Sequence, residues 1–218
     1  MSAPPDHPAL ADAVEEVVSL PGGRDLRMLR PREAEALLDE GAFAEQDEFI
    51  AYWADLWPSA RALAAAVAPR ALRGRRVLEL GCGLGLPSVV AALAGGRVLA
   101  TDWAADALAF VAANAQRNDA QVETLRCAWA DLEPLLARGP FDLVLAADVL
   151  YERRNVEPLL AALDALVAPR GEAWFADPGR EPAQGFFERA RDGGAWQHAQ
   201  SPDPRLPRGA VHRLRRAG

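Results

Sequence analysis

The sequence predicts an α/β fold centred on a mostly parallel sheet, and three observations lead to this prediction. From residue 75 onward, short apolar runs alternate with segments of helical periodicity, as strands and crossover helices do. A glycine-rich segment, LELGCGLGLP at 78–87, comes directly after the first apolar run. The 218 residues suffice for one such domain, or for one domain with a small appendage.

The first half of the expected sheet begins with RVLEL at 76–80, an apolar run that leads into the glycine-rich segment. A helix is expected over 87–94, because proline suits the first turn of a helix and Pro87 stands there. The amphipathic pattern ADALAFVAANAQRN predicts a second helix over 105–118. Further apolar runs predict strands over residues 97–102, 121–129 and 141–148.

The second half of the domain continues the alternation. A helical pattern over 155–171 is expected to stop at Pro169–Gly171, because proline and glycine end helices. EAWFAD at 172–177 is the fifth expected strand, and a further helix is expected near 182–192. Two weaker runs are expected to close the sheet as an antiparallel hairpin, at 195–200 and 210–216.

The first 70 residues have a different pattern. Residues 13–31 predict a hairpin that turns at Pro21-Gly22-Gly23, and residues 32–40 predict a short helix. Three aromatic residues precede an alanine-rich helix that is expected to begin near Pro58, namely Tyr52, Trp53 and Trp57. We expect a small cap over the carboxyl edge of the sheet, with a hairpin and helix extension over 1–45 and the main domain over 46–218.

Composition narrows the classes of partner and compartment. The net charge of −7 argues against a tight non-specific grip on nucleic acid, which depends on neutralising phosphates. Two cysteines, Cys82 and Cys127, make neither a disulfide framework nor a zinc site, which fits a reducing compartment. The N-terminus lacks the pattern of a signal peptide, and the longest uncharged run, 80–96, holds five glycines and a proline. We therefore expect a cytoplasmic protein without nucleic-acid or membrane partners.

The glycine-rich segment predicts a ligand site at the end of the first strand. Gly81, Gly83 and Gly85 allow a tight turn and a close approach of the backbone to a ligand beyond the carboxyl ends of parallel strands. The spacing is G-x-G-x-G rather than the dinucleotide pattern G-x-G-x-x-G. Glu79, just before the first glycine, would repel a pyrophosphate but tolerate a ligand with ammonium and sulfonium groups.

The end of the second expected strand identifies the ligand more closely. Asp102 lies 21 residues after Gly81, where an acidic side chain can accept hydrogen bonds from both hydroxyls of a ribose. Trp103 beside it offers a flat apolar face for an adenine. Together with Glu79, these residues predict S-adenosylmethionine as the cofactor rather than a nicotinamide dinucleotide.

These motifs resemble a known family. Residues 75–177 resemble a class I, seven-strand methyltransferase that uses S-adenosylmethionine, and three stretches are similar to protein-lysine and nicotinamide N-methyltransferase-like proteins: YWADLWPSARALA at 52–64, CAWADL at 127–132 and AADVLYE at 146–152. WPSARALA and DPGR at 177–180 are similar to the branch that methylates lysines of the electron-transfer flavoprotein β subunit. The resemblance implies a Rossmann-like seven-stranded sheet, mostly parallel, with a C-terminal antiparallel hairpin and a small N-terminal cap.

The resemblance also implies a set of residues around the cofactor. It places there Trp57, Gly81, Cys82, Gly83, Asp102, Trp129 and Ala147. For Trp57 and Trp129 the alternative is packing in the core, and Trp129 could also present its backbone rather than its ring to the adenine. Asp131 is either a partner of the adenine amino group or the N-cap of the following helix.

The acceptor side follows from the end of the fourth expected strand. Asp148 and Tyr151 meet the family pattern D/E-x-x-Y/F, whose residues face the methyl acceptor. A lysine nitrogen needs a free lone pair to attack, and only about one lysine in a thousand is neutral near pH 7. We expect Asp148 to orient the acceptor nitrogen and relay its proton to water, while Tyr151 and Trp53 form an aromatic slot. The alternative is that Asp148 caps the next helix and Tyr151 is packing.

The function expected from these residues is N-methylation of lysine side chains in a protein by a monomeric enzyme, with a flavoprotein subunit as a candidate substrate. Three alternatives stay open. The first is methylation of a small amine or a nicotinamide-like molecule. The second is an O-methyltransferase that holds magnesium between Asp148 and Asp177, although Pro178 stands where its third ligand is usual. The third is a partner protein that binds S-adenosylmethionine without catalysis. Among the expected function and its three alternatives, only the O-methyltransferase requires a metal. We therefore expect no metal site in this protein.

Overall fold

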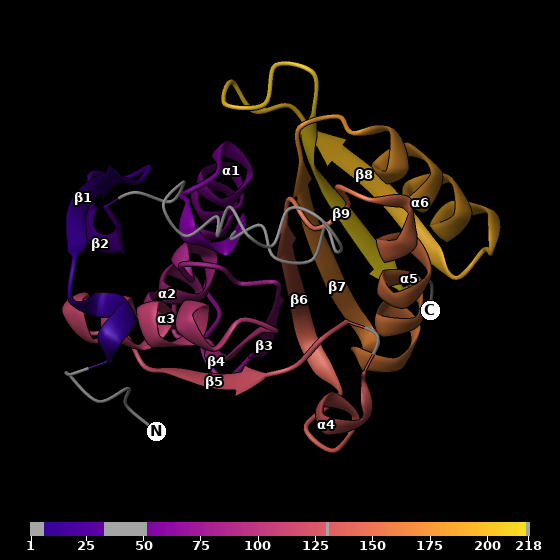
Figure 1. Ribbon diagram of the computed structural model, residues 1–218. Coiled ribbons are helices and arrows are strands. Elements are labelled where there is room, and N and C mark those ends of the chain that lie inside the picture. Colours follow the sequence, from indigo (N-terminus) through magenta and orange to yellow (C-terminus); the bar gives the residue numbers. More distant parts are fainter. Residues whose placement is uncertain (1–6, 33–51, 130, 217–218) are drawn as a thin grey trace, which may run out of the picture.

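A seven-stranded sheet forms the centre of the protein, whose computed structural model describes residues 7–32, 52–129 and 131–216 (Figure 1). The strands lie in the order β5-β4-β3-β6-β7-β9-β8. The first five of these are parallel, and β9 runs antiparallel to both of its neighbours. The bounds are β3 Arg76–Leu80, β4 Arg97–Asp102, β5 Val122–Arg126, β6 Phe141–Ala147, β7 Val167–Asp177, β8 Trp196–Ser201 and β9 Ala210–Arg216. The expected sheet, mostly parallel with an antiparallel C-terminal hairpin, is confirmed.

Two layers of helices cover the sheet (Figure 1). One layer holds α1 Pro58–Val67, α2 Leu86–Leu93 and α3 Ala105–Arg117, and the other holds α4 Glu133–Leu136, α5 Val156–Leu166 and α6 Glu181–Asp192. Successive strand residues point to opposite faces, so Leu143 and Leu145 join the core under the first layer while Val144 and Ala146 join the core under the second. This burial on both faces explains why the strands read as nearly continuous apolar runs.

The strand order reverses between β3 and β6, which are parallel neighbours. From β3 the chain crosses through α2 to β4, whereas from β6 it crosses through α5 to β7 on the other face. The two connections therefore diverge beyond the carboxyl ends of β3 and β6. Such a switch point leaves a crevice in which ligands of open α/β sheets bind.

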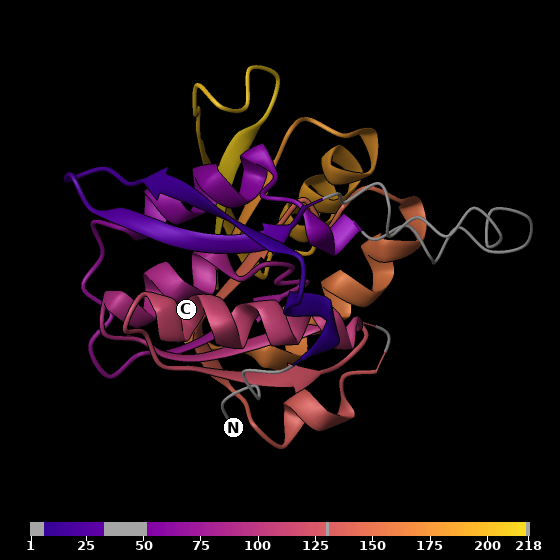
Figure 2. The ribbon, with the colours of Figure 1, turned by 60° about the vertical axis from the view of Figure 1, so that its left-hand side comes forward.

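The N-terminal hairpin is confirmed, with β1 Ala13–Ser19 paired to β2 Asp25–Pro31 around a turn that contains Gly22 and Gly23. Its expected position over the carboxyl edge of the sheet is wrong. Asn114 on α3 and Asn118, the residue that follows this helix, exchange hydrogen bonds with the backbone of β2 at Leu29 and Arg27. The hairpin therefore lies across the outer side of the first helical layer, as Figure 2 shows.

The helix expected over 155–171 is shorter in the structure than predicted. α5 stops at Leu166, and Val167 already pairs with Phe141 in the sheet. Pro169 disfavours helical backbone at the residue before it, and Arg170 has a left-handed φ of 64°. The chain thus enters β7 through an irregular stretch, where the register with β6 shifts between Phe141 and Leu143.

The third expected strand, 121–129, is too long at its C-terminal end. β5 stops at Arg126, because it pairs only with β4 and β4 ends at Asp102. The backbone N–H of Cys127 donates to the carbonyl of Asp102, and the chain then turns away. Nearly all of the short helix expected over 32–40, and the boundary expected between 45 and 46, lie outside the described residues. No described helix has both the length and the apolar character that a membrane crossing requires.

Candidate active site

A cleft opens at the switch point, beyond the carboxyl ends of β3, β4 and β6. Apart from Asp131, the residues that the sequence suggested for cofactor or acceptor line it: Trp53, Trp57, Glu79, Gly81, Cys82, Gly83, Gly85, Asp102, Trp103, Trp129, Ala147, Asp148 and Tyr151. Residues from five different segments of the chain thus meet in one place, because parallel strands bring their carboxyl ends to the same edge. The segment 52–60 covers this edge in place of the hairpin, and it adds Tyr52 and Asp55 to the lining.

The glycine loop between β3 and α2 needs glycine for steric reasons. Gly81, Gly83 and Gly85 have left-handed φ values of 62°, 50° and 77°. A Cβ at Gly81 would lie 2.9 Å from the ring of Trp129, and one at Gly83 would lie 3.1 Å from the carbonyl oxygen of Trp53. The backbone of the loop is therefore in direct contact with two aromatic residues of the cleft. Of the two alternatives for Trp129, the ring rather than the backbone alone reaches the glycine loop.

Asp102 joins the glycine loop to the end of β4. Its Oδ2 accepts the N–H of Gly83 and its Oδ1 accepts the N–H of Ala104, both at 3.0 Å. The side chain is almost completely buried, and this burial raises the pKa of its carboxyl above the usual value. Each oxygen keeps a second lone pair, so the carboxylate can still accept hydrogen bonds from a ligand in the cleft.

Glu79 is the buried acidic residue beneath the glycine loop. Its side chain is 1% exposed, and Ser88 on α2 donates a hydrogen bond to it. Burial raises the pKa of Glu79 to about 8. A cation in the cleft would favour the charged form of this carboxyl, because opposite charges stabilise each other. Burial also raises the pKa of the Cys82 thiol well above its usual value, so this cysteine is no thiolate nucleophile.

Asp148 is the first residue beyond β6 and has a left-handed φ of 57°. Its N–H donates to the carbonyl of Ala176, which ties it to β7. Its Oδ1 accepts a hydrogen bond of 2.6 Å from Nε of Arg180, and Oγ of Ser59 lies 3.5 Å from its Oδ2. The alternative that Asp148 caps the next helix is wrong, because the 3-10 helix Arg153–Asn155 begins after Glu152 and receives no side-chain cap from the described residues.

Aromatic rings surround the acceptor end of the cleft. The ring of Tyr151 lies 5.2 Å from that of Tyr52 and 6.1 Å from that of Trp129, measured between centroids. Trp53 lines the cleft, but its ring packs 5.7 Å from Phe110 in the core. The ring that faces Tyr151 is therefore that of Tyr52, which the sequence did not single out. Burial raises the pKa of Tyr151, so its hydroxyl keeps its proton at neutral pH.

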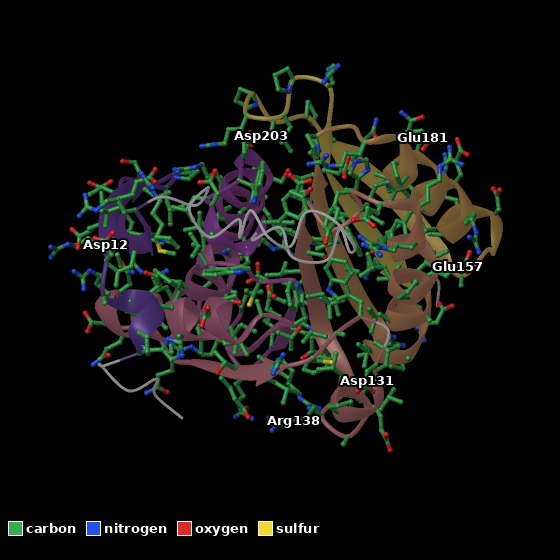
Figure 3. All side chains as sticks on the ribbon, in the orientation of Figure 1. Asp12, Asp131, Arg138, Glu157, Glu181 and Asp203 are labelled. Atoms are coloured by element: carbon green, nitrogen blue, oxygen red, sulfur yellow. The ribbon has the colours of Figure 1, made fainter. Side chains whose placement is uncertain are left out.

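Asp131 has neither of the roles that its position suggested. It does not line the cleft, and the described residues give α4 no side-chain cap. Figure 3 shows it beside α4. The sequence also missed the contribution of Arg180 and Ser59, which contact Asp148 from α6 and α1. The only sequence feature that pointed to Arg180 was DPGR at 177–180, and a similarity of four residues does not reveal which side chain Arg180 contacts.

The carboxylates required by a magnesium site have other partners. Asp148 is ion-paired with Arg180, and Oδ1 of Asp177 accepts the backbone N–H groups of Gly179 and Arg180 at 2.7 Å each. Over residues 7–32, 52–129 and 131–216, no group of three or more His, Cys, Asp or Glu side chains is arranged to hold a metal ion. A guanidinium thus stands beside the two carboxylates that such a cation would need to bridge.

Comparison with known proteins identifies relatives of the chain. A family model described as lysine methyltransferase matches residues 45–191, more than half of the chain. The chain is 39% identical over 100 residues to protein N-lysine methyltransferase METTL21A of Danio rerio, covering 44% of this chain and 45% of that protein. It is 30% identical over 184 residues to histone-arginine methyltransferase METTL23 of Mus musculus, with coverage of 79% and 72%.

A third relative is the electron transfer flavoprotein beta subunit lysine methyltransferase of Xenopus laevis, 32% identical over 135 residues, with coverage of 59% of this chain and 53% of that protein. The chain spans about half the length of this relative and of the Danio rerio protein. Solved structures show the same fold at lower identity. The 16S rRNA methyltransferase RsmC of T. thermophilus has a TM-score of 0.66 at 16% identity, covering 94% of this chain and 51% of that one.

A second similar structure is the magnesium protoporphyrin IX methyltransferase of Synechocystis with bound S-adenosylmethionine. Its TM-score is 0.59 at 20% identity, over 73% of this chain and 80% of that one. The fold is therefore that of the S-adenosylmethionine-dependent methyltransferases. The family match over residues 45–191 shows that the chain belongs to the lysine methyltransferase family.

Proposed function

We propose that this protein transfers a methyl group from S-adenosylmethionine to the side-chain nitrogen of a lysine in another protein. One observation carries the proposal. A single cleft joins a cofactor end, built from the glycine loop and Asp102, to an acceptor end with Asp148 and Tyr151. Membership of the lysine methyltransferase family supports the same class of acceptor.

The cofactor end has the features that S-adenosylmethionine requires. Asp102 would accept hydrogen bonds from the ribose hydroxyls, and Trp103, 43% exposed beside it, would cover the adenine. Glu79 would lie near the positively charged groups of the ligand. Trp57, Gly81, Cys82, Gly83, Gly85, Trp129 and Ala147 would complete the enclosure. When bound, S-adenosylmethionine supplies a methyl group on a positively charged sulfur.

The acceptor end would position a lysine nitrogen for attack along the axis of the bond that breaks. Oδ2 of Asp148 can accept an N–H from this nitrogen, because Arg180 takes the other oxygen and Ser59 is only a distant partner. The rings of Tyr52 and Tyr151, which pack against each other, would form an aromatic wall beside the side chain and favour a cationic or methylated amine as it enters. The proton that the amine loses would pass to water at the mouth of the cleft.

Among lysine substrates, we propose the β subunit of an electron transfer flavoprotein as the first candidate. The support is DPGR at 177–180 and the similarity to the Xenopus laevis enzyme with that printed substrate. METTL21A and METTL23 are similar to this chain to a comparable degree, and the name of METTL23 gives histone arginine as its target. The experiment must therefore identify the methylated residue as well as the methylated protein.

The absence of lysine from this chain excludes automethylation on lysine, so labelled methyl-lysine cannot lie in the enzyme itself, and the lysate without the purified protein is the control. The purified protein is incubated with S-adenosylmethionine labelled in the methyl group and a lysate of the source cells. Protein-bound label is separated from small-molecule label and hydrolysed to amino acids. We expect methyl-lysine in protein. Label in methyl-arginine or in a small amine would replace the proposed acceptor by that one, and no label despite cofactor binding would refute catalysis.

A further inference from the structure

Arg180 contacts Asp148 from outside the cleft. It lies at the start of α6 and does not belong to the cleft lining, whereas Asp148 does. Its Nε donates to Oδ1 of Asp148, and its backbone N–H donates to Oδ1 of Asp177. Arg180 is thus held through its guanidinium and through its backbone, beside a carboxylate whose side chain is 9% exposed.

A carboxylate beside the acceptor creates a conflict. An unpaired negative charge holds a lysine side chain as an ammonium, because it raises the pKa of the amine. The ammonium has no lone pair and cannot attack a methyl group. A carboxylate that only captures the substrate would therefore slow the methyl transfer that follows. The site instead needs a group that accepts a hydrogen bond from the amine but carries little net charge.

We propose that Arg180 is a positioning residue that offsets the charge of Asp148, so that the free oxygen of this carboxylate orients a neutral amine instead of trapping an ammonium. The inference rests on the proposed lysine methylation. It assigns Arg180 a role through Asp148 rather than contact with the substrate.

The other charged and titratable groups around Asp148 strengthen this role. Asp177, from the end of β7, lies close to both Asp148 and Arg180, and burial raises its pKa. Tyr52 also interacts electrostatically with Arg180, and Ser59 from α1 is a neutral neighbour. Arg180 is the cation of this group, and its hydrogen bond to Asp148 raises its pKa. Without it, Asp148 would stand beside a second acidic side chain with no cation to offset either charge.

The test is the pH dependence of single-turnover rates with a protein substrate, for the wild type and Arg180→Gln. In the variant the unpaired carboxylate should raise the pKa of the bound amine. We expect the acidic limb of the rate profile to move up by about one pH unit, which is about a tenfold loss at pH values well below the pKa of the bound amine and is recovered at pH values above it. KM for the substrate should stay equal or fall, because the site now attracts the ammonium. Arg180→Lys should keep the wild-type profile.

Two further variants make the outcome specific. Arg153→Gln removes an exposed arginine whose partner, Glu181, is the first residue of α6, and it should leave the profile unchanged. In an Asp148→Asn background, Arg180→Gln should produce no shift of the limb. Equal loss at every pH in Arg180→Gln would overturn the proposal. If Arg180→Gln does not fold, as judged by lost cofactor binding, the test rests on Arg180→Lys. A merely structural role of the Nε hydrogen bond predicts a loss of rate in Arg180→Lys at every pH.

Failure of the proposed function would look different. In that case the wild-type protein itself would form no methyl-lysine. If only the inference about Arg180 fails, the wild-type protein still forms methyl-lysine, and the acidic limb of the pH–rate profile of Arg180→Gln does not shift.

Discussion

Nε of Arg180 lies 2.6 Å from Oδ1 of Asp148, and this ion pair joins the end of β6 to the start of α6 at the acceptor end of the cleft. Asp148 therefore has one oxygen committed to the protein and one directed to other partners. The residue that the family pattern marks for the acceptor is held in place by the strand, by the backbone of β7 and by the guanidinium. Its orientation is fixed before any substrate binds.

The first prediction concerns Asp148 itself. Asp148→Asn keeps the shape and tolerates the left-handed backbone, but it removes the charge and one hydrogen-bond acceptor. We expect methyl transfer to fall at least about 100-fold, in line with the loss of a group that orients the nucleophile. Calorimetry should show an unchanged affinity for S-adenosylmethionine. Asp12→Asn, at an exposed ion pair with Arg32, is the control. Full turnover in Asp148→Asn would remove this residue from the mechanism.

The second prediction compares two glycines with positive φ. Gly81→Ala and Gly22→Ala share the strain of a left-handed backbone, on the order of 1–2 kcal/mol. Only the methyl group at position 81 meets the Trp129 ring, whereas nothing lies within 4 Å of one at position 22. Both variants should lose stability in denaturant titrations, Gly81→Ala by more because of the steric contact, but only Gly81→Ala should bind S-adenosylmethionine at least about tenfold more weakly. Equal affinities in the two variants would show that the loop does not touch the cofactor.

A third prediction follows from the pKa of Glu79, which is about 8 in the folded protein and near 4.5 in the unfolded chain. Between these values the folded state holds a proton that the unfolded state releases, so rising pH favours unfolding. The stability linked to this group is fully present below pH 4.5 and is lost as the pH rises through 8, by at most about 1.4 kcal/mol per unit.

Glu79→Gln keeps the side chain neutral, so its free energy of unfolding should fall less from pH 5 to pH 8 than that of the wild type. Chemical denaturation at four pH values measures the difference. Glu123→Gln, at an exposed ion pair with Arg138, should follow the wild type. Parallel curves for Glu79→Gln and the wild type would mean that Glu79 is charged in the folded protein.

A fourth prediction separates the two ends of the cleft through two exposed aromatic residues. Trp103 follows β4 on the cofactor side, and Tyr52 faces Tyr151 on the acceptor side, with side chains 43% and 41% exposed. Trp103→Ala should weaken S-adenosylmethionine about tenfold and leave KM for the protein substrate unchanged. Tyr52→Ala should do the reverse, since cation–π and packing contacts of this kind contribute about 1–2 kcal/mol. Calorimetry measures the affinity for S-adenosylmethionine, and steady-state kinetics measure KM for the protein substrate. If Trp103→Ala changed only KM and Tyr52→Ala changed only cofactor affinity, the cofactor and acceptor ends of the cleft would have to be exchanged.

The residues that the sequence suggested lie together because the ends of parallel strands meet at one edge. Glu79, Asp102 and Asp148 each stand at or next to the end of a strand that an apolar run predicts. Once the strand order is that of an open sheet with a switch point, residues at these ends must converge. Their convergence could therefore be predicted without knowledge of any side-chain contact.

The relationships that the sequence did not reveal depend on tertiary contacts. Arg180 lies 32 positions after Asp148 and reaches it only because β6 and β7 are neighbours. Tyr52 rather than Trp53 faces Tyr151 because Trp53 turns toward Phe110 in the core. The hairpin covers α3 instead of the carboxyl edge because Asn114 and Asn118 bond its backbone. None of these three contacts can be predicted from the hydrophobic periodicity of the sequence.

Titration calorimetry with S-adenosylmethionine on the folded wild-type protein tests the central claim most directly, because every assignment in the cleft depends on a cofactor held by the glycine loop and Asp102. We predict one binding site per chain and a loss of at least about tenfold in affinity in Asp102→Ala, in which Gly83 and Ala104 lose their hydrogen-bond acceptor. A flat titration with the wild type, for both the cofactor and its demethylated product, would contradict the claim.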